Sequence, residues 1–251
     1  MKLRNLTLAL AAVFCYTFSS NILYAQKPNP NDWANLNRYR PQNEELLKKD
    51  ETAKEKTPEG RKAKQTLKNR VVFMGNSITD NWFKFHPDFF TENGFEGRGI
   101  SGQTTPQMLI RFRQDVVNIG AKTVVILAGT NDIAGNTGYS SLEMIMDNIK
   151  SMCDIAKANN IRPILCSVLP AYRYSWKKDV KPNELIPQLN KMIKEYAKAN
   201  RITYVDFFPA LADKTPGNEN GLPEKYSKDG VHPNIDGYRI MEDILLKVLN
   251  R

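Results

Sequence analysis

The sequence predicts an α/β protein, built as a three-layer α/β/α sandwich around a parallel sheet of about five strands. Short apolar runs, rich in Val and Ile, are typical of strands that are buried on both faces of a parallel sheet. Longer segments with an apolar residue every three or four positions are typical of amphipathic helices. The two kinds of segment alternate along the chain, and this order favours helices on both faces of the sheet.

Five segments are the expected strands of this sheet. The clearest are residues 71–74 and 123–128, because each is a continuous apolar run. The expected strands are 71–74, 95–100, 123–128, 164–169 and 202–207.

Helices are expected between the strands, wherever the apolar residues recur at helical spacing. The best example follows the third strand, where Leu142, Ile145 and Ile149 lie on one face of a helix. Such a face packs on the sheet and leaves the charged residues in solvent. The expected helices are 105–116, 142–155, 187–199 and 234–249.

The first 25 residues carry the pattern of an export signal. Lys2 and Arg4 give a basic start, and an apolar run over residues 6–18 follows, which is short for a membrane span. Ala25 is the small residue expected before a cleavage site. We therefore expect residues 1–25 to be a signal peptide and the mature protein to be secreted or periplasmic, without stable membrane insertion. A retained N-terminal anchor is the alternative.

The mature chain is expected to be one domain with a polar extension in front of it. Residues 26–69 are the N-terminal extension, and residues 70–251 are long enough for a single α/β core. Within the extension, the helical spacing of Trp33, Leu36 and Tyr39 predicts a short helix that Pro41 interrupts.

Composition excludes several classes of function. The formal charge of +9 comes from lysines scattered along the predicted helices, without the basic, aromatic-interleaved stripe of a nucleic-acid-binding surface. No Cys/His cluster has zinc-ligand spacing and no second phosphate-cradling loop appears, so no metal and no cofactor are expected. Cys153 and Cys166 remain after signal cleavage; they form either a disulfide or two buried free thiols.

Residues capable of chemistry follow the predicted strands. Ser77 comes directly after the first strand, Gly102 after the second and Asn131 after the third, while Asp229 and His232 precede the last helix. Ligands bind at the carboxyl ends of the strands in such sheets, so these five residues are expected at one edge.

The residue types suit nucleophilic catalysis. A serine at a helix start has backbone N–H groups beside its oxygen. An aspartate three residues before a histidine, with Gly230 between them, can turn back to orient the imidazole. Each residue also has a structural explanation: Ser77 could be an N-cap or part of a phosphate-binding turn, and Asn131 could close a local turn.

Taken together, four sequence blocks resemble those of the SGNH hydrolase family, also called GDSL-type esterases and lipases, and its acetylhydrolase-like subgroup. Ser77 lies in GNSITD, Gly102 in GISGQTT and Asn131 in GTND, while Asp229 and His232 lie in DGVHP. The resemblance runs from about residue 71 to residue 249. One departure from the GDSL form is Asn76 in place of aspartate, a side chain outside the family's catalytic groups.

The resemblance implies a flavodoxin-like SGNH-hydrolase fold and a role for each residue. Ser77 is the implied nucleophile, His232 the general base and Asp229 the residue that orients it. The N–H groups of Ser77 and Gly102 and the side chain of Asn131 are the implied oxyanion hole. The implied function is that of a secreted serine ester hydrolase that acts through an acyl-serine intermediate.

The substrate is less clearly indicated. Short loops without a long apolar lid segment favour a small acyl group such as acetyl, carried by a carbohydrate or similar small ester. Aromatic side chains suit sugar rings, and Trp82, Tyr172 and Trp176 are the candidate substrate-binding residues. Longer acyl chains, as in a lysophospholipase or a thioesterase, are the alternative, and a non-catalytic ligand-binding module is a remote one. The sequence predicts no oligomeric state.

Overall fold

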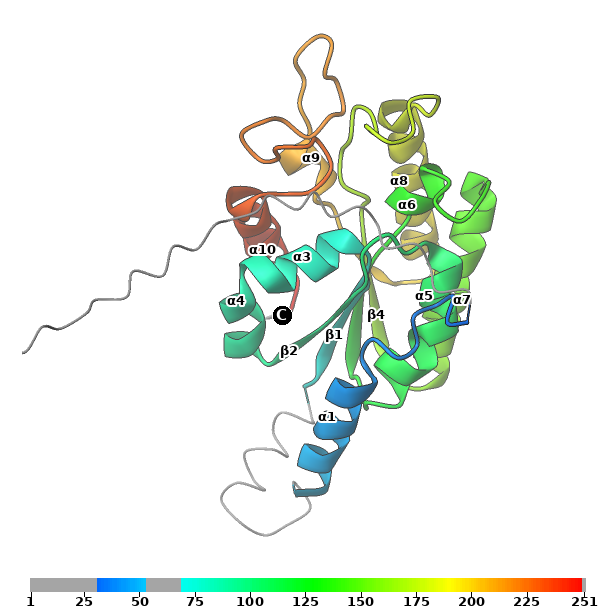
Figure 1. The fold of residues 1–251 in the computed structure, drawn as a ribbon, viewed down its shortest axis with the longest axis vertical. Helices are drawn as coiled ribbons and strands as arrows, with labels where there is room; N and C mark the ends of the chain where they lie inside the picture. The colour runs from blue at the N-terminus through cyan, green and yellow to red at the C-terminus, as the bar shows by residue number, and fades with distance from the viewer. Residues whose placement is uncertain (1–30, 53–68, 250–251) are drawn as a thin grey trace, which may run out of the picture.

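The computed structural model describes residues 31–52 and 69–249, and these contain one parallel sheet (Figure 1). Its strand order is β2-β1-β3-β4-β5, and every neighbouring pair is parallel. This confirms the predicted α/β class and the predicted five strands. The strands are β1 Val71–Gly75, β2 Phe95–Gly99, β3 Thr123–Leu127, β4 Arg162–Cys166 and β5 Thr203–Val205.

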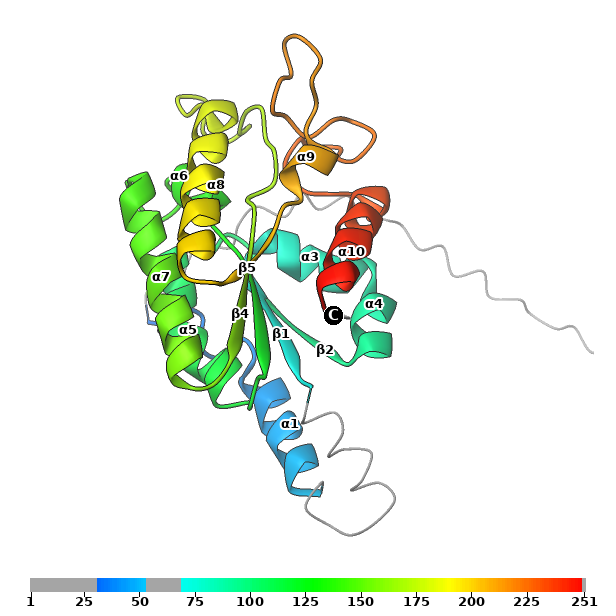
Figure 2. The same ribbon diagram turned by 180° about the vertical axis from the view of Figure 1, so that it is seen from behind.

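Helices cover both faces of the sheet, as Figures 1 and 2 show from opposite sides. Alternate residues of one strand serve the two layers: Val72 and Met74 pack with one helix group, Val71 and Phe73 with the other. One group is α5 Thr105–Phe112, which continues as the π-helical turn η1 Arg113–Val117, with α7 Leu142–Ala158 and α8 Pro182–Ala199. The other is α3 Ser77–Phe85, α4 Pro87–Asn93 and α10 Ile235–Leu249. Two short helices, α6 Thr130–Ile133 and α9 Phe208–Leu211, follow β3 and β5.

The fourth and fifth strands end earlier than the sequence predicts. The hydroxyl of Ser167 accepts hydrogen bonds from the N–H groups of Phe207 and Phe208, at 2.9 and 3.1 Å. Because a side chain takes these backbone donors, the ladder between the two strands stops there. The expected limits at residues 169 and 207 are therefore wrong.

Helix α8 begins five residues before the predicted start. Pro182 stands at its first position, and Pro187 lies inside the helix. A proline there cannot donate to the carbonyl of Asn183, four residues earlier. The side-chain amide of Asn220 donates to that carbonyl instead, at 3.2 Å, which compensates for the missing bond.

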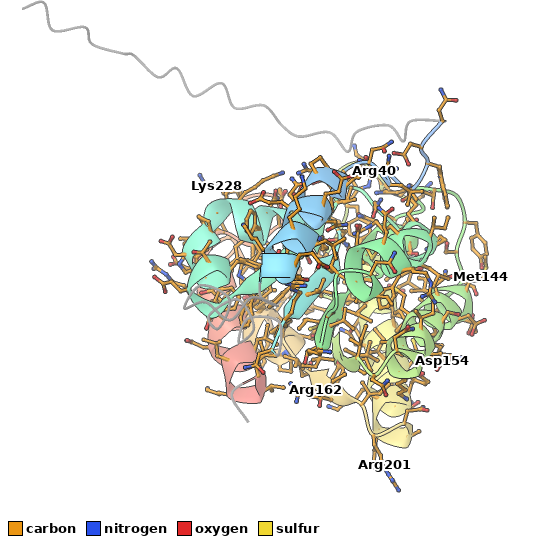
Figure 3. The ribbon with its side chains drawn as sticks, turned by 90° about the horizontal axis from the view of Figure 1, so that it is seen from below. Arg40, Met144, Asp154, Arg162, Arg201 and Lys228 are labelled. Carbon is orange, nitrogen blue, oxygen red and sulfur yellow. The ribbon has the colours of Figure 1, made fainter. Side chains whose placement is uncertain are left out.

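The N-terminal residues that the structure describes pack against the sheet domain. Residues 31–39 form turns rather than the predicted helix, and Pro41, expected to interrupt a helix, is instead the second residue of α1 Arg40–Thr52. Asp50 of α1 forms an ion pair with the buried Arg70, at 2.7 Å, just before β1. In Figure 1 α1 extends below the sheet, and in the view from below Arg40 lies near one end of α1 and α7, which carries Met144 and Asp154, lies to one side (Figure 3). The described part of the N-terminal extension is therefore held against the sheet domain by this ion pair.

Both cysteines of the sheet domain are free and buried, so the free-thiol alternative is the correct one. Burial raises the pKa of Cys153 to about 12 and also raises the pKa of Cys166. The predicted signal peptide, residues 1–25, lies outside the described residues and stays a prediction. No helix within residues 31–52 and 69–249 is both long and apolar enough to cross a membrane.

Candidate active site

Ser77 begins α3, directly above the carboxyl end of β1. The helix starts so close to the strand ends that side chains would not fit: a Cβ on Gly99 would lie 2.2 Å from the Asp80 nitrogen. Asn76 is the N-cap of α3, and its Oδ1 accepts the N–H of Ile78 at 3.0 Å. Because Asn76 caps the helix, the hydroxyl of Ser77 is available for other contacts.

The structure brings Ser77 and His232 together, although 155 residues separate them in the chain. Ser77 Oγ lies 2.8 Å from His232 Nε2, and His232 Nδ1 lies 2.7 Å from Asp229 Oδ2. The hydroxyl and the imidazole are both half-buried. The three side chains thus form one hydrogen-bonded chain, which is the geometry that base-assisted attack by a hydroxyl requires.

A tight turn holds the Asp229 carboxylate in place. Its Oδ1 accepts the N–H groups of Val231 and His232 at 2.9 and 2.8 Å, and the hydroxyl of Ser227 at 3.1 Å. Gly230, at φ 76°, allows the turn. Partial burial opposes ionisation of Asp229, but the hydrogen bonds from the ring and backbone of His232 outweigh it, so its pKa lies below the ordinary value. Sequence reasoning missed Ser227, which carries no motif signal.

The strand order places the two other predicted loops on either side of Ser77. Gly102 follows β2 and Asn131 follows β3, and these strands flank β1. The Asn131 amide donates one N–H to the carbonyl of Gln103 at 2.9 Å, which leaves its second N–H for a ligand. Within the described chain, no hydrogen bond uses the N–H of Ser77 or of Gly102. These N–H groups are thus free to donate to a ligand, and their role as an oxyanion hole stays a prediction.

Asp132 joins the loops after β2 and β3 by hydrogen bonds. Its Oδ1 accepts the N–H and the hydroxyl of Thr105, at 2.8 and 2.5 Å. Its Oδ2 is buried and has no partner among the residues that the structure describes. Burial therefore raises the pKa of Asp132 from 3.8 to about 6.

The raised pKa of Asp132 predicts a pH-dependent stability. A carboxyl with a higher pKa in the folded chain stabilises the fold below its unfolded pKa of 3.8, and this contribution is lost as the pH rises through about 6. The shift corresponds to on the order of 2–3 kcal/mol. Asp132→Asn should therefore raise the melting temperature at pH 8 by about 5 °C and change it little at pH 4, as measured by thermal unfolding.

Asp213→Asn is the control for this prediction. The pKa of Asp213 is lowered to about 2 by hydrogen bonds from Thr215 and Asn218, so its neutral variant should gain no stability at pH 8. Equal changes in the melting temperature of Asp132→Asn at both pH values would contradict the assignment.

The three candidate substrate-binding residues lie in very different places. Trp82 is 1% exposed and stacks on Phe89 and Tyr238, at ring distances of 5.3 and 5.5 Å. Its Nε1 donates to Glu242 at 2.8 Å. The face of α3 that carries Trp82 packs on the core, so the expectation that Trp82 contacts substrate is wrong. Tyr172 is half-buried in the loop after β4, and its role stays a prediction.

Trp176, in contrast, is 48% exposed beside the Gly102 loop. Its ring stacks on Tyr174 at 5.1 Å, and its Nε1 donates to Asn136 Oδ1 at 3.3 Å. The amide of Asn136 in turn donates to the carbonyl of Gly102 at 3.3 Å. The side-chain amide of Asn136 therefore joins the exposed indole of Trp176 to the loop after β2. Sequence reasoning missed Asn136 and Tyr174 as its supports.

A hollow of about 570 Å³ is lined by residues close to this tryptophan in the chain, although not by Trp176 itself. Its walls include Gly135 and Gly138, on either side of Asn136, and Lys177, next to Trp176. Lys177 forms an ion pair with Asp179 at 2.9 Å, and both side chains line the hollow. The wall thus mixes apolar, charged and hydroxyl groups.

The second histidine lies in another part of the molecule. His86 Nδ1 is 2.7 Å from Glu242 Oε1, the oxygen that also accepts the indole N–H of Trp82. Glu242 is 7% exposed, and the pair links α10 to the end of α3. No group of three or more His, Cys, Asp or Glu side chains within residues 31–52 and 69–249 is arranged to hold a metal ion.

Serine hydrolases are recognised by a hydroxyl, an imidazole and a carboxylate that are joined by hydrogen bonds beside free N–H donors, whatever their fold. Ser77, His232 and Asp229 have this arrangement. The chain belongs to the GDSL-like lipase/acylhydrolase family, whose model matches residues 73–240. Its class is that of the carboxylic ester hydrolases, and the family predicted from the four sequence blocks is confirmed.

Several known proteins are similar to this chain. A solved structure of a GDSL-like lipase from Bacteroides thetaiotaomicron is 44% identical, with a TM-score of 0.76 over 86% of this chain and 98% of that one. The isoamyl acetate-hydrolyzing esterase of Saccharomyces cerevisiae is 23% identical over 210 residues, 72% of this chain and 85% of the esterase. N-acylneuraminate cytidylyltransferase of Escherichia coli is 25% identical over 183 residues, 71% of this chain; this chain spans only 40% of that relative.

Proposed function

We propose that the chain is a secreted serine esterase that removes small acyl groups, acetyl above all, from carbohydrates. The observation that carries the chemistry is the chain of hydrogen bonds from Ser77 through His232 to Asp229, at 2.8 and 2.7 Å. Secretion rests on the export pattern of residues 1–25. The acetyl preference is supported by the similarity to an esterase that hydrolyses isoamyl acetate.

In the proposed reaction, His232 Nε2 takes the proton from Ser77 Oγ as this oxygen attacks the ester carbonyl. Asp229 accepts the Nδ1–H and stabilises the imidazolium. The N–H groups of Ser77 and Gly102 and the Asn131 amide stabilise the oxyanion; loss of one such donor costs about 3–4 kcal/mol.

The rest of the reaction has two stages, completion of the acyl transfer to Ser77 and hydrolysis of the acyl-serine. The C–O bond to the alcohol breaks, and His232 returns its proton to the leaving alkoxide, which leaves an acyl group on Ser77. Water attacks this acyl-serine, again with His232 as the base. The tetrahedral intermediate expels Ser77 Oγ, which regains its proton, and the carboxylic acid is released.

The carbohydrate assignment rests on the surroundings of Trp176. An aromatic face that is fixed by stacking and a hydrogen bond offers a platform for the apolar face of a sugar ring. The neighbouring hollow of about 570 Å³ has room for a further sugar unit. Because Asn136 joins Trp176 to Gly102, a ring on the platform would lie beside the reacting carbonyl.

A substrate series tests the proposal. We expect kcat/KM to be highest for p-nitrophenyl acetate and to fall steadily toward the palmitate ester, and acetylated sugars to be hydrolysed. A rise toward long chains would instead indicate a lysophospholipase or thioesterase. No hydrolysis of any member would indicate a non-catalytic binding module.

The variant Trp176→Ala separates the sugar platform from the chemistry. It should lower kcat/KM for an acetylated oligosaccharide by about tenfold and leave p-nitrophenyl acetate unaffected. Phe85→Ala, which removes another exposed aromatic ring, is the matched control and should change neither. Equal rates of the Trp176 variant and the wild type on the oligosaccharide would remove the platform from the proposal.

A further inference from the structure

Three glutamines bind the turn that precedes α1, named here the N-terminal strap, residues 32–39. The Nε2 atoms of Gln103, Gln107 and Gln114 donate to the carbonyls of Ala34, Trp33 and Leu36, each at 2.7 Å. The strap is itself held by Asp32, whose carboxylate accepts the N–H groups of Leu36 and Asn37, at 2.7 and 3.1 Å. Hydrogen bonds from side chains thus fix the backbone of the strap.

Gln103 differs from the other two because it also belongs to the Gly102 loop. Its backbone carbonyl accepts the side-chain amide of Asn131 at 2.9 Å. Its side chain is 3% exposed, and its Oε1 accepts Nε of Arg111 at 2.6 Å. Both ends of the Gln103 amide are therefore occupied, one by the strap and the other by a buried cation.

Arg111 connects the same network to the strand that carries the nucleophile. The guanidinium is fully buried and donates to the carbonyl of Gly75 at 2.9 Å, two residues before Ser77. It also forms an ion pair with Asp115 at 3.1 Å, and Asp115 accepts the amide of Asn43 from α1 at 2.8 Å. The network thus reaches the end of β1 and the N-terminal segment.

We propose that Gln103 is a positioning residue, through which the N-terminal strap fixes the Gly102 and Asn131 donors for the oxyanion. This inference rests on the proposed function of those donors. Gly102 has a φ of 80° and no side chain, so its peptide groups can rotate unless neighbouring residues hold them. Gln103, the next residue, is held because it donates to the Ala34 carbonyl and accepts from Arg111, and its own carbonyl orients the Asn131 amide.

Replacement of Gln103 by methionine tests the proposal, with Gln114→Met as the matched control. Both variants lose a 2.7 Å bond to the strap, but Gln114 makes no hydrogen bond to the Gly102 loop among the described residues. With p-nitrophenyl acetate, Gln103→Met should lower kcat by about 10- to 100-fold and change KM less than twofold, because misplaced donors fail mainly in the transition state. Gln114→Met should keep kcat. Both should lower the melting temperature.

A change in the strap alone provides a second arm that leaves the buried network intact. Asp32→Ala loosens the turn that presents the Ala34 carbonyl, so it should also lower kcat without raising KM, and it should have no further effect when combined with Gln103→Met. A boronic acid that forms a tetrahedral adduct with serine should bind Gln103→Met more weakly than the wild type.

The outcomes separate this inference from the proposed function. Activity of the wild type and its loss in Ser77→Ala decide whether the chain is a serine esterase. An unchanged kcat in Gln103→Met, or an equal loss in Gln114→Met, would show that the strap contacts serve folding alone and would overturn the inference.

Discussion

Replacing Ser77 with alanine is expected to lower kcat for p-nitrophenyl acetate by at least about 10⁴-fold, because the attacking oxygen is lost while the oxyanion donors remain. The same variant should not react with an organophosphonate, which forms a stable bond to an activated serine. Intact-mass spectrometry measures the labelling directly. The wild type should gain one adduct per chain.

Ser151→Ala is the matched control for this prediction. Ser151 lies on the exposed side of α7, and its hydroxyl donates only to the carbonyl of Asp147. This variant should keep both turnover and labelling. The melting temperature of Ser77→Ala should stay near that of the wild type, since the hydroxyl is only half-buried. Labelling of Ser77→Ala at the wild-type rate would place the nucleophile on another residue.

The fold could be predicted because its local signals agree. Val71–Gly75 and Thr123–Leu127 are buried at every position, and the sequence shows this as unbroken apolar runs. Ser77, Gly102 and Asn131 follow strands, and the rule that parallel strands end at one edge placed them together. The same rule favoured this edge for His232, but its pairing with Ser77 needed the resemblance of the sequence blocks, because nothing local relates residues 155 positions apart.

Two of the incorrect predictions, the role of Trp82 and the start of α8, also have physical causes. Trp82 was expected near substrate because it follows the nucleophile, but the 3.6-residue period puts it on the face of α3 that also buries Ile78. Pro187 was expected to start a helix, because proline is common at the first helical position. Here it lies inside the helix, and Asn220, 33 residues later, donates to the carbonyl that proline leaves free. Contacts from distant residues decided both cases.

The positioning residues were also beyond sequence reasoning. Gln103, Asn136 and Ser227 are ordinary polar residues, and their partners lie 69, 34 or as few as two positions away. A glutamine can use its amide in many ways, so its type predicts no partner. Only the path of the N-terminal strap shows why this glutamine is buried beside the Gly102 loop.

Replacing Asp229 with asparagine is expected to lower kcat by about 10³- to 10⁴-fold with little change in the fold. The side-chain oxygen of asparagine can still accept the N–H groups of Val231 and His232, so the turn should persist. Its NH₂ group, however, meets Nδ1 and favours the tautomer with the proton on Nε2. That nitrogen then cannot accept the proton of Ser77.

The pH profile distinguishes this role from a structural one. Partial burial opposes ionisation of Asp229, but the hydrogen bonds from His232 hold its pKa below the ordinary value, so the carboxylate keeps its charge at a pH where a free aspartate is protonated. We therefore expect the pH profile of wild-type kcat/KM to show no protonation step at the ordinary pKa of an aspartate.

Glu242→Gln is the matched control, because Glu242 forms the other His–carboxylate contact that the structure describes, at 2.7 Å from His86. It lies against the core at Trp82, away from the strand ends, so this variant should lower the melting temperature and keep kcat within about twofold, as expected for a group outside the reacting chain. A large loss of kcat in Glu242→Gln together with an active Asp229→Asn would assign the base to His86. The contrast between two His–carboxylate pairs in one molecule therefore tests whether a serine hydroxyl beside the imidazole, and not the pair itself, makes the site.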